Sequence, residues 1–228
     1  KLDSNGNYVE KKWVTGLDAP KGLAIVKDHL FVADINKIWK ISLIDKSKKF
    51  FKIYRPGFLN DLVADKSGNI YASDMFKNII YRLKDNKIEL WKKSDMLFSP
   101  NGLLIDKENL IIACWGKRTE GFKTEIPGYL VKLNLKNRTI TKFFSTRPIG
   151  NLDGIVFNKG RVEDSYFERG YFVTDWIKGK LFSVNNKGIA RVILDINKGS
   201  ADLEIIMHKN VIVIPMMLDN SIIAYKLK

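Results

Sequence analysis

The stretch that decides the fold is Asn60-Asp61-Leu62-Val63, followed by Ile70-Tyr71-Ala72-Ser73-Asp74 and Ile79-Ile80-Tyr81-Arg82-Leu83. Each run is short and rich in aliphatic and aromatic residues, and a turn signal, Asp65-Lys66-Ser67-Gly68-Asn69, separates the first two. Such runs predict β-strands joined by tight turns. Helical periodicity is nearly absent from the rest of the chain, so the sequence predicts an all-β protein.

The same three-run unit occurs five times along the chain. The units begin at Lys21, Asn60, Asn101, Asp153 and Ala201, with spacings of 39, 41, 52 and 48 residues. A fourth apolar run follows the third in most units, at residues 49–53, 88–91, 140–143 and 190–193. Four strands in ~40–50 residues is typical of a β-propeller blade. The repeat therefore predicts five nearly complete blades.

The two ends of the chain do not complete this pattern. Residues 8–14 are predicted to form an amphipathic strand from the last hairpin of an earlier blade, and the fifth unit stops after its third strand. In a closed propeller the termini usually build one blade together. We therefore expect residues 1–228 to form a single six-bladed β-propeller domain that lacks roughly 50–70 N-terminal residues, judged by blade length. A natural five-bladed ring is the alternative.

Composition and charge exclude several classes of protein. The chain has 228 residues, of which 45% are hydrophobic and 28% charged, and this balance is ordinary for a soluble globular domain. No apolar stretch is long enough to span a membrane. The net charge of +14 comes mainly from scattered lysines, whereas a specific nucleic-acid surface would cluster its basic residues and use arginine. We expect only salt-sensitive, non-specific adhesion to polyanions.

Cysteine and histidine usage excludes further chemistries. The single cysteine, Cys114, permits no disulfide within the chain, and it is expected to end a buried strand together with Trp115. His29 and His208 lack the spacing of zinc ligands. Residues 116–124 resemble a phosphate-binding loop, but Phe122 interrupts the required Gly-Lys-Thr and no helix-forming run follows.

Three aspartates and two insertions are interpreted as structural. Asp34, Asp74 and Asp175 recur at strand ends at the blade spacing, which indicates turn capping rather than catalysis. The insertion Gly116–Gly128 lies between the second and third strands of its blade and could be a lid over the channel, although we favour a longer surface loop. The excursion Gly160–Gly170 is expected to be a solvated hairpin tip.

The first residues of the units are the candidate functional residues. The loop into each innermost strand of a propeller faces one end of the central channel, so equivalent side chains converge on the axis. Asn60, Asn101 and Asp153 would supply two amide oxygens and one carboxylate, which suit Ca²⁺ or, less well, Mg²⁺ or Mn²⁺. Asn or Asp before Gly also makes tight turns without any metal, and spacing alone does not decide between these interpretations.

Longer motifs surround these residues in a fixed order along the chain: Trp13–Leu23, Phe58–Asp61, Ser99–Leu103, Ile149–Gly154, Gly199–Glu204 and Pro215–Asn220. With them the chain resembles, over essentially its whole length, the SMP-30/gluconolactonase/luciferin-regenerating-enzyme-like family of six-bladed propellers, and especially a bacterial branch of it. The resemblance implies one divalent metal at the channel mouth, held by Asn60, Asn101 and Asp153. The family's remaining metal ligand, a Glu of the first blade, has no counterpart here, and its loss should weaken Ca²⁺ binding.

The resemblance also implies a reaction, the hydrolysis of a lactone or similar ester with Asp153 as the base that accepts a proton from the attacking water. Lys21, Asp61, Asp202 and Trp115 are the candidate substrate-binding residues. A non-catalytic propeller that binds a ligand or a protein is the alternative, because propellers have many functions. The branch implies a periplasmic protein, with the cytoplasm as the alternative, and the sequence predicts no oligomeric state.

Overall fold

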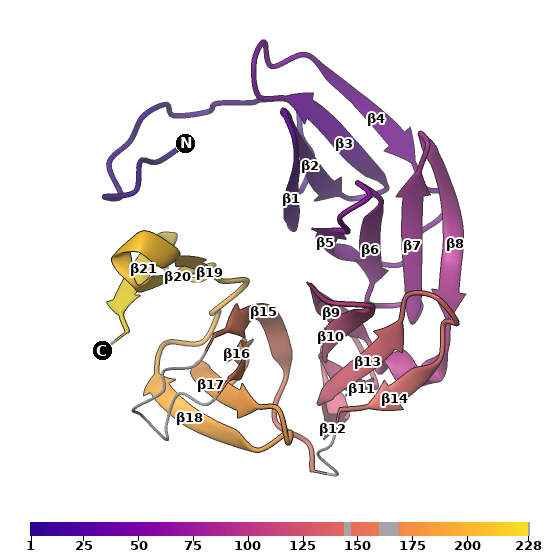
Figure 1. Cartoon of the computed structure of the whole chain (residues 1–228), viewed down its shortest axis with the longest axis vertical. Helices are drawn as coiled ribbons and strands as arrows, with labels where there is room; N and C mark the ends of the chain where they lie inside the picture. The colour runs from indigo at the N-terminus through magenta and orange to yellow at the C-terminus, as the bar shows by residue number, and fades with distance from the viewer. Residues whose placement is uncertain (144–146, 160–168, 228) are drawn as a thin grey trace.

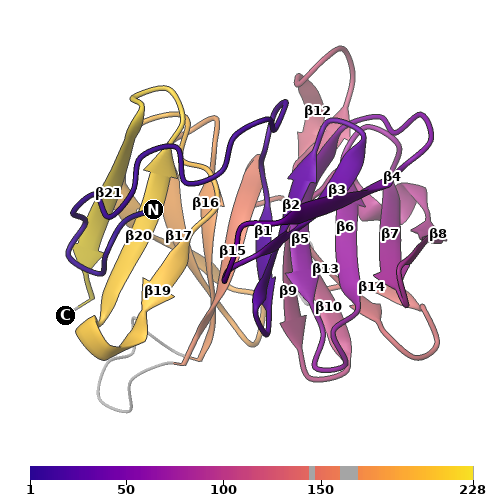
Figure 2. The same ribbon diagram turned by 90° about the horizontal axis from the view of Figure 1, so that it is seen from above.

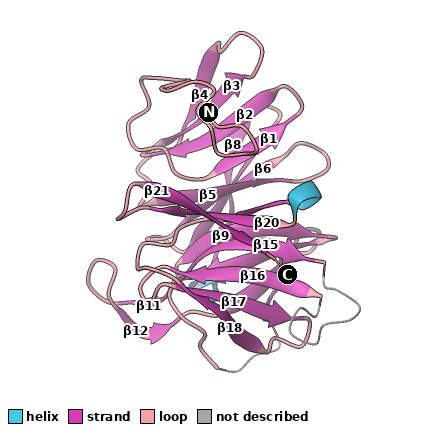
Figure 3. Cartoon of the chain, turned by 90° about the vertical axis from the view of Figure 1, so that its left-hand side faces the viewer, coloured by secondary structure: helices cyan, strands magenta, loops and turns pink. Residues whose placement is uncertain are grey.

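The computed structural model describes residues 1–143, 147–159 and 169–227. Nearly all regular structure in these residues is β-strand (Figure 3), as the sequence predicts. Most of the excursion Gly160–Gly170 lies outside the described residues, so its predicted hairpin tip remains untested. No helix in the described part of the chain is long and apolar enough to cross a membrane.

Five antiparallel sheets are arranged as the blades of a propeller around a central axis (Figure 1). We number the blades 1 to 5 along the chain. Their strands are β1 to β4 (Leu23–Val26, His29–Asp34, Lys37–Ser42, Lys48–Lys52), β5 to β8 (Leu59–Ala64, Ile70–Asp74, Ile79–Lys84, Lys87–Lys93), β9, β10, β13 and β14 (Pro100–Asp106, Asn109–Cys114, Leu130–Asn134, Ile140–Lys142), β15 to β18 (Leu152–Asn158, Gly170–Asp175, Lys180–Asn185, Ala190–Asp195) and β19 to β21 (Glu204–Ile206, Val211–Met216, Ser221–Lys226).

The predicted all-β propeller is therefore confirmed, as are the fourth strands of blades 1 to 4. Blade 5 has three strands, and a sixth blade is not present among the described residues. A short hairpin, β11 (Gly116–Arg118) and β12 (Thr124–Pro127), interrupts blade 3 between β10 and β13. The sequence placed an insertion at this point without predicting its strands.

The hydrophobic core lies between neighbouring blades. Ala24, Phe31 and Ile38 of blade 1 pack against Leu62 and Ile70 of blade 2, and similar clusters join each following pair. Successive side chains of a strand point to opposite faces of its sheet, so the innermost strands of blades 2 to 4 each contribute to two of these clusters. Each fully buried Leu, Ile or Phe contributes about 1.5–3 kcal/mol, and this burial holds neighbouring blades together.

The predicted strand at residues 8–14 is wrong. These residues form turns and bends, with a single bridge between Leu2 and Tyr8. Trp13, Val14 and Leu17 instead pack against the face of blade 1 that points away from blade 2, where Trp39 and Ile41 are buried. An isolated hairpin is marginal in water without a third strand or a partner sheet, and the described residues provide no such partner for this segment.

The capping role predicted for Asp34, Asp74 and Asp175 is confirmed. Asp175 Oδ1 accepts from the backbone N–H of Ile177 and Lys178 in the turn after β16, both at 3.0 Å, whereas the other two caps also hold a preceding loop. Asp34, at the end of β2, accepts hydrogen bonds from the backbone N–H of Asp18 (2.9 Å) and Ala19 (2.6 Å). Asp74, at the end of β6, accepts in the same way from Gly57 (2.8 Å) and Phe58 (2.9 Å). Each carboxylate thereby fixes the loop that leads into its blade's innermost strand.

The Asp34 cap predicts a pH effect on stability. Burial alone would raise the pKa of Asp34, but hydrogen bonds from three backbone N–H groups and the Trp39 indole hold it at about 2. Because the folded pKa lies below the unfolded value of 3.8, this stabilisation is complete above about pH 4 and is lost as the pH falls through about 2. Asp34→Asn is expected to lower the free energy of unfolding at pH 7 by about 2 kcal/mol.

Urea titrations at pH 7 and pH 3 test this prediction. The difference between wild type and Asp34→Asn should be smaller at pH 3. The matched control is Asp195→Asn, because the Asp195 side chain is 77% exposed. An Asp34→Asn effect no larger than the control's would contradict the role given to the cap.

Candidate functional site

The predicted metal ligands lie on β-bulges at one end of three innermost strands. In β5, Leu59 pairs with Asp74 and Leu62 pairs with Ala72, so Asn60 and Asp61 both lie opposite Ser73. The register of β9 shifts in the same way at Asn101 and Gly102, and that of β15 shifts at Asp153 and Gly154. A bulge bends the strand and redirects its side chains, and bulges are common beside active sites.

Side-chain hydroxyls replace the backbone pairing that two of these bulges lose. Ser73 Oγ accepts a hydrogen bond from Asp61 N–H at 3.0 Å in blade 2. In blade 4, Thr174 Oγ1 accepts from Gly154 N–H at 2.9 Å and donates to the carbonyl of Ala201 in blade 5 at 2.7 Å. Thr174 therefore stabilises one bulge and also connects two blades.

Glycines allow the bulges of neighbouring blades to approach closely. A Cβ on Gly102 would lie 2.0 Å from the carbonyl oxygen of Asp153, and a Cβ on Gly154 would lie 2.5 Å from Cα of Asp202. No side chain fits at either position without displacing backbone. The Gly that follows Asn101 and Asp153 in the sequence is thus required by the close contact between blades, since neither glycine has a left-handed backbone conformation.

Asn101 and Asp153 are brought together. The Asn101 side chain is 1% exposed, and its Nδ2 donates to the carbonyl of Leu152 at 3.1 Å. Its amide also hydrogen-bonds the Asp153 carboxyl, which lowers the pKa of Asp153 against the larger effect of burial. Asn101 Oδ1 is buried and, among the described residues, has no hydrogen-bond partner. A buried amide oxygen without a partner is costly, and a cation would satisfy it.

Burial raises the pKa of three channel carboxyls, and the charge of Asp202 adds to this effect at Asp153 and Asp61. Burial, followed by the charge of Asp202, raises the pKa of Asp153 to about 7. Burial also raises the pKa of Asp202 to about 6 and places that of Asp61 well above its ordinary range. The charge of Asp202 thus acts on both Asp153 and Asp61, and a joint role of the three carboxyls in a site stays a prediction.

Asp61 has a structural role that the sequence did not reveal. Its Oδ1 accepts from Leu62 N–H and its Oδ2 accepts from Leu103 N–H in blade 3, both at 2.7 Å. The side chain is thus a link between two innermost strands. Contact between Asp61 and a substrate remains a prediction.

Lys21 and Trp115 lie within a group of aromatic rings at this end of the channel. We call Phe58, Phe76, Trp115, Phe122 and Trp176 the aromatic rim. Their ring centroids form a connected series with separations of 5.0 to 6.0 Å. Lys21 Nζ lies 4.8 Å from the centroid of Phe58 and donates to the Ala19 carbonyl at 3.0 Å. Burial lowers the pKa of Lys21.

The β11–β12 hairpin supplies Phe122 to this rim. Phe122 packs edge-on against both Phe58 and Phe76 of blade 2, and its carbonyl accepts a hydrogen bond from Trp115 Nε1 at 2.9 Å. The insertion therefore contacts blade 2 through Phe122, although most of its residues are exposed, as expected of a surface loop. No periodicity in the sequence indicated this contact, because it depends on how two blades are placed.

The described residues contain no group of three His, Cys, Asp or Glu side chains arranged to hold a metal. A divalent ion at the channel mouth would therefore depend on amide oxygens in addition to Asp153, as the predicted set does.

Cys114 is fully buried at the end of β10, where burial raises the pKa of its thiol, so it matches its predicted structural role.

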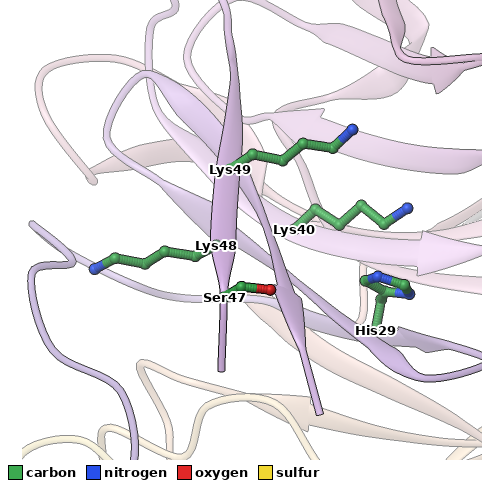
Figure 4. A pocket seen from close by; sticks show the side chains of 5 residues that line it. All are labelled: His29, Lys40, Ser47, Lys48 and Lys49. Carbon is green, nitrogen blue, oxygen red and sulfur yellow. The ribbon is translucent and has the colours of Figure 1, made fainter. Parts of the chain in front are cut away.

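A shallow pocket away from the channel is lined by His29, Lys40, Ser47, Lys48 and Lys49 of blade 1. In Figure 4, Lys40, Lys49 and His29 extend to one side, whereas Lys48 points the other way. The Ser47 hydroxyl donates to Asp45 at 2.8 Å. The pocket thus offers positive charge and no acid–base pair, which suits weak adhesion of anions rather than catalysis.

Known proteins resemble the chain in fold. No protein-family model and no curated protein sequence matches it. Among solved structures, virginiamycin B lyase from Staphylococcus aureus is 11% identical, with a TM-score of 0.59 over 92% of this chain and 70% of that chain. A provisionally assigned gluconolactonase is 15% identical, with a TM-score of 0.62 over 94% and 80%. A chain of a nidogen/laminin complex is 14% identical, with a TM-score of 0.65 over 91% and 80%.

The Thr174 link gives a second testable prediction. Thr174→Val keeps the shape of the side chain but removes its hydroxyl. The buried Gly154 N–H then loses its acceptor, and the Ala201 carbonyl loses one donor. It should lower the free energy of unfolding by about 1–3 kcal/mol. Thr174→Ser restores both bonds and should lose only the ~0.8 kcal/mol of one buried methyl group. Urea unfolding followed by tryptophan fluorescence measures both variants, and equal losses would contradict the proposed link.

Proposed function

We propose that the protein is a metal-dependent hydrolase of lactones or similar esters, with its reaction centre at the channel end formed by Asn60, Asn101 and Asp153. The observation that carries the proposal is the buried Asn101 Oδ1, which lacks a hydrogen-bond partner among the described residues and lies beside a carboxyl with a raised pKa. The fold is shared with enzymes, which is compatible with the proposal but does not specify the reaction.

The side chains at this end fit a hard divalent ion such as Ca²⁺. Asn101 Oδ1 and the Asp153 carboxylate are oxygen donors, and the Leu152 carbonyl holds the Asn101 amide through its Nδ2. Asn60 lies at the corresponding bulge of blade 2. A bound ion would supply Lewis acidity toward the carbonyl oxygen of an ester. Only one of these donors carries a full negative charge, so we expect modest affinity.

Asp153 is suited to move a proton near neutral pH. Burial and the charge of Asp202 raise the pKa of Asp153 in the metal-free protein to about 7, so that its carboxylate accepts a proton more readily than an ordinary aspartate; a bound cation would lower this pKa. In the proposed reaction Asp153 takes a proton from the attacking water as the new C–O bond forms. It then returns that proton to the alkoxide as the ring C–O bond breaks, so that a hydroxy acid results.

Calorimetry and a lactone panel test the proposal together. Wild type should bind Ca²⁺ and hydrolyse at least one lactone, whereas Asp153→Asn should lose turnover by a factor on the order of 10² or more. Asn101→Ala should abolish calcium binding. The matched control is Asp106→Asn, at the opposite end of β9, where the carboxylate accepts from Tyr171 at 2.7 Å. This control should bind calcium like wild type.

Two outcomes would overturn the proposal. One is the absence of both calcium binding and lactone hydrolysis in a folded protein. The other is a ligand or protein partner that binds equally well to wild type and Asp153→Asn, which would favour the non-catalytic alternative.

We further propose export to the periplasm, on the strength of the family resemblance, and fractionation of the source cells is expected to place the protein there.

A further inference from the structure

The β11–β12 hairpin is tied to the innermost strand that carries Asp153. Asn151, which is 7% exposed and precedes β15, donates from Nδ2 to the carbonyl of Trp115 at 2.9 Å and to Thr124 Oγ1 at 3.0 Å. Trp115 comes immediately before β11, and Thr124 begins β12. On its other side the hairpin packs on blade 2 through Phe122. The aromatic rim is therefore fixed beside the candidate reaction centre, at the end of the strands where Figure 2 shows β12.

A guanidinium on this hairpin forms no ion pair with the described residues. Arg118 Cζ lies 3.7 Å from the centroid of the Phe76 ring, and Nη1 donates to the carbonyl of Gly121. Nε is buried and makes no hydrogen bond within the described part of the chain. Asp74 acts on Arg118 through its charge, but its carboxylate already accepts from three backbone N–H groups. Burial lowers the pKa of Arg118, so an added anion would stabilise its charged form.

Two lysines continue this arrangement on other rings of the rim. Lys21 Nζ lies 4.8 Å from the centroid of Phe58. Lys198 Nζ lies 5.5 Å from the centroid of Trp176. Neither lysine takes part in the ion pairs between described residues. This end of the channel thus combines apolar ring surface with three positive charges that, in the described part of the chain, have no carboxylate bound to them.

This combination favours one ligand chemistry. Aromatic rings stabilise flat or hydrocarbon groups by apolar contact. A guanidinium binds a carboxylate through charge-assisted hydrogen bonds. A neutral apolar molecule would leave the three cations unpaired, whereas a polyhydroxylated sugar acid would make little use of the rings. A compound that is both apolar and anionic contacts the rings and the cations together.

We propose that the aromatic rim, together with Arg118, Lys21 and Lys198, binds carboxylates that carry a flat apolar group. Arg118 binds the carboxylate, and Phe122, which is 48% exposed, contacts the apolar group. The preferred substrate is then an ester or lactone that bears an aryl carboxylate, a statement that rests on the proposed function. The binding site itself does not depend on that function.

Calorimetry with three probes in calcium-free buffer tests the binding site. Cinnamate has a flat apolar group and a carboxylate, cinnamyl alcohol has the same group without the charge, and gluconate has the charge without the apolar group. Wild type should bind cinnamate about 10-fold more tightly than either of the other probes. Omitting calcium ensures that no metal ion binds the carboxylate.

Four variants show whether the rim is responsible for this binding. Arg118→Gln should weaken cinnamate binding about 10-fold without changing the affinity for cinnamyl alcohol, whereas Phe122→Ala should weaken the binding of both. The matched controls are Arg138→Gln and Phe50→Ala. Arg138 also stacks on a ring, that of Trp91 at 5.5 Å, and Phe50 is 53% exposed on β4. Both controls should bind cinnamate like wild type.

Two binding results would overturn the inference. One is cinnamate binding that is no tighter than that of the other two probes. The other is an equal loss in Arg118→Gln and Arg138→Gln, because scattered surface charge would then explain the binding.

Failure of the proposed function gives a different result, in which cinnamate binds but no lactone is hydrolysed in the presence of calcium. If lactones are hydrolysed, Arg118→Gln should raise KM for a lactone that bears an aryl carboxylate without lowering kcat. Hydrolysis of neutral or sugar lactones by a protein that does not bind cinnamate would overturn the inference and leave the hydrolase proposal intact.

Discussion

The hydrogen bonds from loop backbone to Asp34 and Asp74 position the remaining features of the site. Each carboxylate ends the second strand of its blade and holds the loop that leads into the innermost strand. A backbone N–H buried without an acceptor would cost about 1–3 kcal/mol, so these loops have little freedom to move. In blade 2 the fixed loop leads directly into the bulge that carries Asn60. The Asp74 cap therefore helps to position Asn60.

Bulges and glycines then bring neighbouring blades together at this end of the channel. The bulge turns Asn101 and Asp153 out of the regular alternation of their strands, and Gly102 allows the two strands to approach within backbone contact. The close approach buries carboxyls beside one another, and their pKa values rise as a result. The close approach of the blades therefore also raises the pKa of Asp153 in the metal-free protein.

The sequence by itself determined the all-β class and the five blades, because strand alternation and the blade repeat are local patterns; that Asn60 converges with Asn101 and Asp153 stays a prediction. It also identified Asp34 and Asp74 as caps. Only the tertiary structure decided which loops those caps hold, how the hairpin of Phe122 packs on another blade, and that residues 8–14 are not a strand. These features depend on contacts between segments far apart in the chain. The residues next to a position in the sequence do not indicate which blade will pack against it.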